Sequence, residues 1–322
     1  MLVALSAAVS VSVLAGCAGG SPSDTPTASD LSMRYTDRLG WSFRYPASMH
    51  LERSKLVSRL SIHEVTVANF EARRPIHTTS NAHGLSIGVE PPRPAHGSFP
   101  SDGIAFRVYQ QEGGPGPYLE APEVRLPLHI DDLKPSTAYA STRPRPLGKG
   151  ISAAGRNYAV YAWIGHDASP HQRSAVQAVV QSLSFPHLRE GTVAGYGFSV
   201  LGRAHRYPVG SFTPVRIQRQ TFYLVHAPGG FYTVGCCWNT SFPIQSACGL
   251  RFDPVGKQFF CKSMPGRWDR IARPTGSDAG EDTLILAITK LSWDGHVLVY
   301  PGSARLGNRQ LARQYWPAWS GR

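Results

Sequence analysis

The stretch that decides the fold of the C-terminal part of the chain is Cys248-Gly-Leu-Arg-Phe-Asp-Pro-Val-Gly-Lys-Gln-Phe-Phe-Cys261-Lys-Ser-Met-Pro-Gly-Arg-Trp-Asp269. It opens on a cysteine, continues as an apolar and aromatic segment, turns at a glycine and returns through Phe-Phe-Cys261 to Arg-Trp-Asp269. The pattern predicts two short strands that are joined by a tight turn.

Closely spaced strands are expected before and after this stretch. Apolar and aromatic residues predict strands over 214–219, 221–226 and 231–235, and a Pro228-Gly-Gly230 turn separates the last two. The segment Trp293-Asp-Gly-His-Val-Leu-Val299 adds a late strand. The second half of the chain therefore reads as all-β.

The order of these features resembles a Rieske domain. The family has a cysteine, a strand, a glycine turn and a second cysteine box, and the 13 positions from Cys248 to Cys261 suit the gap between its two boxes. The resemblance implies an all-β Rieske-like domain over residues 207–304. A connector over 187–206 would precede it, and a C-terminal tail over 305–322 would follow.

The ligand positions of that family are degenerate here. A Rieske cluster needs two cysteine thiolates on one iron and two histidine nitrogens on the other. The resemblance places Pro243 at the first cysteine ligand and Gln245 at the first histidine ligand, whereas Cys261 keeps a thiolate position and Met264 replaces the second histidine. Proline has no donor, and glutamine and methionine are poor substitutes for imidazole. We expect no cofactor; the alternative is a Rieske-type electron-transfer protein that holds a [2Fe-2S] cluster through an unusual ligand set.

The same cysteines are disulfide candidates. Cys236, Cys237, Cys248 and Cys261 allow three complete pairings, and the residues alone do not choose among them. In the Rieske family a disulfide joins the two cluster loops. The resemblance places Ser263 at the position of one of the two bonded cysteines, so that disulfide cannot form here. Our hypothesis is that Cys248 forms a disulfide with Cys261 instead, and that this disulfide holds the two loops together. A redox role for the adjacent pair Cys236 and Cys237 is a further alternative.

The first residues of the chain bear on its location in the cell. Leu2 to Leu14 is an apolar run without charge, too short to span a bilayer, and it closes on Leu14-Ala-Gly-Cys17. This resembles the lipobox of bacterial lipoproteins, although no Lys or Arg precedes the run. The resemblance implies a signal peptide over 1–17, lipidation of Cys17, a flexible tether over 18–33 and anchoring to the cell membrane on its extracytoplasmic side.

A first domain is expected over residues 34–186. Trp41, Phe43 and Tyr45 alternate with polar residues at the strand period, and further strands are expected over 63–70, 84–89, 104–110 and 158–164. Ser169-Pro170 then predicts a helix start, followed by apolar residues at helical spacing over 176–183. This order resembles PsbP-like domains, which implies an α+β fold, an antiparallel sheet flanked by helices, that acts as a binding or assembly module.

Two patterns in this first domain suggest chemistry. Gly84-Leu-Ser86-Ile-Gly88 fits a hydrolase nucleophile elbow, but that motif needs a following helix, and Val89-Glu-Pro-Pro follows instead. The histidines His63, His77, His83 and His96 lack ligand spacing, so we interpret them as solvated loop residues. We therefore expect no catalytic residue here, and no enzyme activity unless the cluster survives.

The net charge and its distribution along the chain bear on which class of molecule the protein binds. The 33 Lys and Arg against 21 Asp and Glu give a net charge of +12, but the basic residues are scattered and no nucleic-acid-binding signature is present. We expect no nucleic acid as a partner. The sequence favours a non-catalytic binding or scaffold protein at the membrane, with an extracytoplasmic protein as its partner.

Overall fold

The computed structural model describes residues 30–56, 62–73, 77–81, 84–88, 91–94, 96–111, 123–137, 143–218, 220–235, 249–262, 266–275, 284–306 and 309–318. The structure is mostly β, with 47% strand and 12% helix, and its sheets are antiparallel. The expected α+β class of residues 34–186 is not confirmed, because α1 (Pro170–Gln181) is the one α-helix in the described part of that range. No helix in the described ranges is long and apolar enough to cross a membrane.

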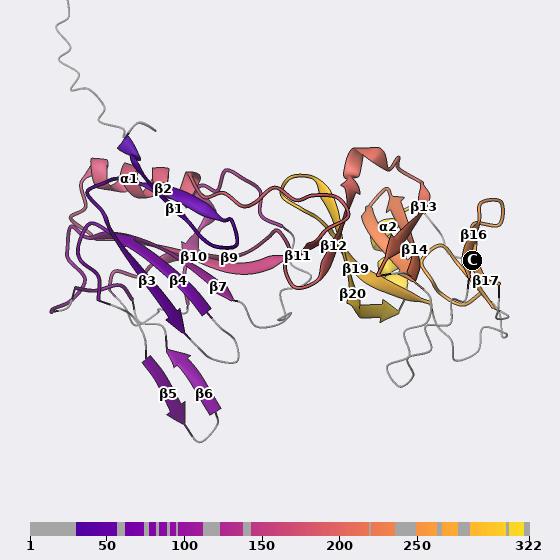
Figure 1. The fold of residues 1–322 in the computed structure, drawn as a ribbon, viewed down its shortest axis with the longest axis horizontal. Coiled ribbons are helices and arrows are strands. Elements are labelled where there is room, and N and C mark those ends of the chain that lie inside the picture. The colour runs from indigo at the N-terminus through magenta and orange to yellow at the C-terminus, as the bar shows by residue number, and fades with distance from the viewer. Residues whose placement is uncertain are drawn as a thin grey trace, which may run out of the picture.

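A six-stranded sheet organises the N-terminal half, in the order β3-β4-β7-β10-β9-β8 (Figure 1). Its strands are β3 (His50–Leu56), β4 (Ile62–Ala68), β7 (Ile104–Gln111), β8 (Lys134–Pro135), β9 (Leu147–Ala153) and β10 (Arg156–Ile164). The short 3-10 helix η2 (Ile130–Asp132) precedes β8. The strands predicted over 63–70, 104–110 and 158–164 are confirmed within a few residues of their ends.

Helix α1 covers one face of this sheet. Ser169 caps it by accepting a hydrogen bond from the Gln172 N–H, and Pro170 occupies the first turn, as predicted. Val176, Val179 and Val180 are fully buried against the sheet. A separate ribbon of β1 (Met33–Thr36) and β2 (Ser42–Tyr45) adds aromatic rings to the same core.

A small hairpin, β5 (His77–Asn81) with β6 (Gly84–Gly88), extends away from the six-stranded sheet in Figure 1. It contains the suspected nucleophile elbow. Ser86 lies within β6, opposite Thr79 of β5. Because the residue sits inside a paired strand and not at a turn into a helix, the elbow geometry is absent at this position.

A seven-stranded sheet organises the C-terminal half, in the order β11-β12-β20-β19-β15-β14-β13. Its strands are β11 (Val193–Ala194), β12 (Phe198–Arg203), β13 (Phe212–Ile217), β14 (Gln220–Ala227), β15 (Gly230–Gly235), β19 (Ile285–Leu291) and β20 (His296–Leu306), with the 3-10 helix η3 (Ala204–Arg206) after β12. The predicted hairpin around Pro228-Gly-Gly230 is confirmed as the turn between β14 and β15. Strand β13 ends the sheet and carries Pro214, which is typical of an edge strand.

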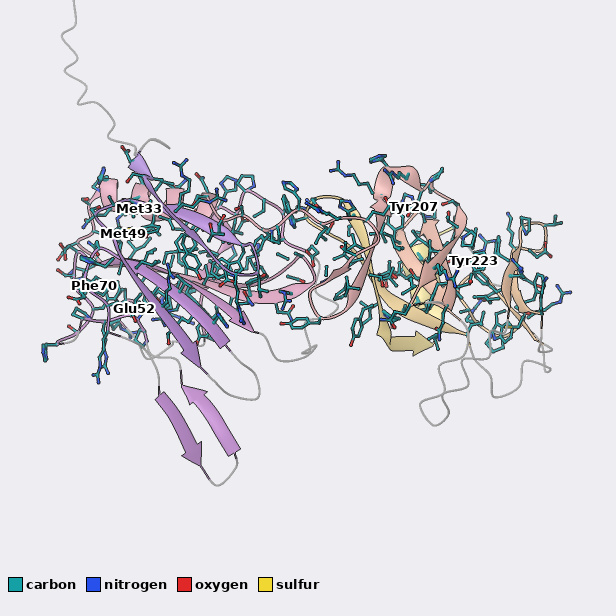
Figure 2. All side chains as sticks on the ribbon, viewed as in Figure 1. Met33, Met49, Glu52, Phe70, Tyr207 and Tyr223 are labelled. Carbon is teal, nitrogen blue, oxygen red and sulfur yellow. The ribbon has the colours of Figure 1, made fainter. Side chains whose placement is uncertain are left out.

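A three-stranded sheet of β16 (Leu250–Asp253), β17 (Gln258–Cys261) and β18 (Arg267–Trp268) packs against the seven-stranded one. It confirms the two short strands predicted on either side of the glycine turn. Tyr223 of β14, labelled in Figure 2, places its ring 5.6 Å from the ring of Phe259. Helix α2 (Arg309–Tyr315) closes this core through the buried side chains of Leu311 and Ala312.

The two halves meet along a seam. The Tyr196 N–H donates to the Gly155 carbonyl at 3.2 Å, and the Leu188 N–H donates to Asp294 at 2.9 Å. Gly195 is required at the seam, because a Cβ there would lie 1.9 Å from the Gly155 carbonyl oxygen. Described strands up to β10 pair among themselves and those from β11 onward do the same, so the seam joins two separately hydrogen-bonded units.

Candidate functional site

Most residues that the sequence singled out lie outside the described residues. They are Cys17, Cys236, Cys237, Pro243, Gln245, Cys248 and Met264, together with His83. Of the four positions that the resemblance aligns with Rieske ligands, only Cys261 therefore has a described geometry.

Cys261 is the last residue of β17 and pairs with Leu250 across the strand ladder. Its side chain is 6% exposed and packs in the core beneath the three-stranded sheet. The side chain is disulfide-bonded, and its partner lies outside the described residues. Cysteine binds a metal as its thiolate, so a sulfur that is held in a disulfide is not available to an iron.

The residues that the Rieske resemblance would place at the ligand positions do not fit a [2Fe-2S] cluster. The donor set is Pro243, Gln245, Cys261 and Met264, and it contains no imidazole and one cysteine. The described ranges also hold no group of three or more His, Cys, Asp or Glu that could bind a metal ion. No chemistry of the cluster is therefore assigned to this chain.

The suspected histidines do not come together in the described structure. His63 lies on β4, where its Nε2 is 3.1 Å from the Arg38 guanidinium, and His77 lies on the β5 strand. His96 is exposed in a bend. The interpretation of these residues as loop histidines is wrong for His63 and His77, because both are in strands.

A groove in the C-terminal half, lined by described residues, is a candidate binding site. It has a volume of about 390 Å³, within the roughly 300–1,000 Å³ typical of ligand sites. Its walls come from β13, from the turn between β16 and β17, from the loop after β18 and from the residue after α2. The lining residues are Gly210, Phe212, Phe252, Pro254, Lys257, Arg270 and Trp316.

Three nearly parallel rings form the apolar part of this aromatic–basic groove. The ring of Phe212 stacks on that of Phe252 with centroids 3.7 Å apart and an angle of 8°. The Trp316 ring lies 6.1 Å from Phe212 at 10°. All three side chains are partly buried, so the stack leaves part of its ring surface open to a ligand.

A hydrogen-bonded chain fixes Trp316 in the groove. Its indole Nε1–H donates to the Tyr232 hydroxyl at 3.0 Å, and that hydroxyl donates to the Arg270 carbonyl at 2.5 Å. Burial raises the pKa of Tyr232 above its usual range, so this hydroxyl stays protonated and can donate. In the C-terminal tail, α2 and Trp316 pack on the core of the three-stranded sheet, whereas Trp319 lies outside the described residues.

Two cations stand beside the rings. The Arg270 guanidinium lies over the Trp316 ring, 4.7 Å from its centroid. Lys257 is exposed at the turn and has no carboxylate partner within the described ranges. No lining residue is acidic. The groove therefore suits a ligand that combines a flat apolar group with a negative charge.

Sequence patterns do not identify this groove, because its parts are distant in the chain. Phe212 and Trp316 come from opposite ends of the C-terminal half, and only the fold brings their rings together. The one available signal was the aromatic tail Tyr315-Trp-Pro-Ala-Trp319.

Comparison with protein families, with curated proteins and with solved structures finds no match for this chain.

Proposed function

We propose that this chain is an exported, lipid-anchored, non-catalytic binding protein that holds an extracytoplasmic protein partner in the aromatic–basic groove. The partner would present an aromatic side chain next to a carboxylate. The observation that carries the proposal is the stack of Phe212, Phe252 and Trp316 beside the cations Lys257 and Arg270.

The chemistry of the groove supports this class of partner. An aromatic side chain would stack on the exposed parts of the three rings, which contributes about 0.5–1.5 kcal/mol beyond burial of its area. A neighbouring carboxylate would meet the cations of the groove, Lys257 and Arg270, and no lining residue is acidic. Rings held by packing and by the Tyr232 hydrogen bonds lose little freedom on binding.

As part of this proposal, the C-terminal half is a Rieske-like domain and the N-terminal half is a PsbP-like domain. The β16 and β17 pair around a glycine turn supports the first, and the antiparallel sheet with α1 on one face supports the second. In this proposal the Rieske-like unit serves as a binding scaffold without a cluster, and Cys17 supplies the membrane anchor.

Three capped tripeptides test the groove. Ligand-observed NMR titration of the full-length chain in detergent would compare acetyl-Asp-Trp-Asp-amide, acetyl-Lys-Trp-Lys-amide and acetyl-Asp-Ala-Asp-amide. We expect the first to bind at least about fivefold more tightly than the other two, because it alone supplies both a ring and negative charge. Equal binding of all three peptides, or none, would contradict the proposed function.

Substitutions of groove residues test whether the acidic aromatic peptide binds in the groove. Lys257→Met should weaken binding of the acidic aromatic peptide by about threefold, and Phe252→Leu should weaken it by a similar factor. Arg251→Met is the matched control, since Arg251 neighbours Phe252 in β16 but faces the other side of the sheet. Loss of binding in the control variant as well would show that the peptide binds elsewhere.

A further inference from the structure

A second pocket lies at the seam between the two halves, apart from the aromatic–basic groove. It has a volume of about 290 Å³. Its walls come from the turn between β9 and β10, from Leu39 near β2 and from the segment 186–195 that links the two halves. Pockets at such junctions are common places for ligand binding.

Two arginines make this seam pocket positive. Arg156 begins β10 and lies over the ring of Tyr196 at 5.8 Å, while Arg189 is exposed on the linking segment. Neither arginine forms an ion pair with a carboxylate in the described ranges, and no acidic residue lines the pocket. A guanidinium offers paired N–H donors that match the oxygens of a phosphate or carboxylate.

Tyr158 supplies a buried donor. It lies two residues after Arg156 in the same strand, so both side chains project from one face of the sheet. Tyr158 is 4% exposed and lines the pocket, and its hydroxyl has no hydrogen-bond partner among the described residues. The rings of Trp41 and Phe185 hold its ring from two sides. The hydroxyl oxygen is not among the fully buried polar atoms that lack a partner, so it is open to the pocket and can donate to a ligand oxygen.

The carboxylates nearest to the pocket are already engaged. Asp294 lies 3.7 Å from the Nδ1 of His187 and accepts from the Ser292 hydroxyl and the Leu188 N–H. Asp37 accepts from the Tyr35 hydroxyl and the Leu39 N–H. Glu123 accepts from the Gly155 N–H and pairs with Lys290, so this carboxylate also already has partners.

We propose that the seam pocket binds a small phosphate-class oxyanion between Arg156, Arg189 and Tyr158. The guanidinium groups neutralise its charge, and the phenol donates a hydrogen bond to one of its oxygens. Because the pocket is built from both sides of the seam, the bound anion would contact the N-terminal sheet and the segment that leads to the C-terminal sheet. The site is separate from the proposed partner groove and stands independently of it.

Isothermal titration of the full-length chain in nonionic detergent, in a phosphate-free buffer at pH 7, tests this site with inorganic phosphate as the probe. We expect one site per chain. Arg156→Gln should raise the Kd about tenfold, and Tyr158→Phe about threefold. Arg216→Gln removes an equal charge from the exposed surface of β13 and should leave the Kd unchanged. Absence of phosphate binding, or equal binding in all three variants, overturns the proposal.

Two further probes distinguish the sources of such an anion. Glycerol 3-phosphate represents a free phosphate ester, and water-soluble dihexanoyl phosphatidylglycerol represents a lipid headgroup. The phosphodiester of the lipid carries one negative charge fewer than the phosphate monoester. Glycerol 3-phosphate should therefore bind more tightly than the short-chain lipid if the pocket binds dissolved phosphates. Tighter binding of the short-chain lipid would identify a headgroup as the source instead. The Tyr158→Phe variant loses only one hydroxyl, so we expect it to fold. A thermal unfolding midpoint equal to that of the wild type would show that weaker phosphate binding does not come from lost folding.

Discussion

Lys290 of β19 lies 3.0 Å from Glu123, and this buried ion pair ties the C-terminal half to the N-terminal half across the seam. The ammonium also donates to the Ser152 hydroxyl at 2.6 Å and lies 4.7 Å from the centre of the Phe198 ring. On the other side, one oxygen of Glu123 accepts from Ser152 and from the Gly155 N–H. Both side chains are less than a tenth exposed, so burial lowers the pKa of Lys290.

Removal of one partner of this pair should be costly. Lys290→Met leaves the Glu123 carboxylate buried without its cation, and we expect the free energy of unfolding to fall by about 3–5 kcal/mol. The double variant Lys290→Met with Glu123→Leu should recover most of that loss, since it buries no charge. Urea denaturation of the wild type, of Lys290→Met, of Glu123→Leu and of the double variant completes a double-mutant cycle and measures the coupling. A neutral effect of Lys290→Met would show that the seam does not depend on the pair.

The buried pair Glu64 and Arg107 predicts a pH dependence of stability. Glu64 Oε1 lies 2.8 Å from the Arg107 Nε, but burial outweighs that attraction and raises the pKa of Glu64 to about 7. The folded state therefore keeps a proton that the unfolded chain loses above its ordinary pKa of 4.5. This contribution to stability is fully present below pH 4.5 and is lost as the pH rises through 7.

The measurement is chemical denaturation of the wild type and of Glu64→Gln between pH 5 and 8. The slope that Glu64 contributes is at most one proton, or about 1.4 kcal/mol per pH unit. Glu64→Gln should lose this slope and keep the remaining pH dependence. An identical pH profile in the two proteins would mean that Glu64 is ionised over the whole range.

Metal analysis tests the absence of a cluster. The full-length protein, produced through an exporting pathway with iron supplied and handled without oxygen, should contain neither stoichiometric iron nor acid-labile sulfide. The reason is the donor set Pro243, Gln245, Cys261 and Met264. Two irons per chain with a Rieske-like visible spectrum would instead make the chain an electron carrier.

Peptide mapping without reduction tests the disulfide hypothesis. We expect Cys261 to be recovered in a disulfide with Cys248. Leu250 pairs with Cys261 at the end of the β16–β17 ladder, and a Cβ added to the preceding Gly249 would lie 3.3 Å from the Cβ of Lys262. Loss of this bridge in Cys248→Ser should lower stability by about 3 kcal/mol in the chain-entropy model. Recovery of Cys248 as a free thiol would exclude the pairing.

Local signals in the sequence predicted local structure well. Ser169 and Pro170 with the spaced valines of α1 specify a helix through neighbours in the chain, and the Pro228-Gly-Gly230 turn specifies a hairpin in the same way. Strand β9 was missed, because Leu-Gly-Lys-Gly-Ile-Ser-Ala lacks a clear alternation and is held by its partner β10.

The candidate sites were much less predictable. Lys290 stands in an apolar segment without a local partner, and its carboxylate comes from Glu123 in the other half of the chain. The groove likewise needs the ring of Trp316 to reach Phe212 across the C-terminal core. Such sites depend on tertiary contacts, and a single sequence contains no periodic signal for them.

Pro214 in the terminal strand β13 bears on how a partner can approach. Proline has no N–H to donate, and its neighbour Arg216 is exposed and charged. A second chain that tried to extend the seven-stranded sheet at this edge would meet a gap in the hydrogen-bond ladder and a solvated cation. The nearby Phe212 side chain remains accessible from the groove. Recognition at this end of the molecule is therefore restricted to side-chain contacts, which favours a choice of partner by residue type over indiscriminate β-sheet growth.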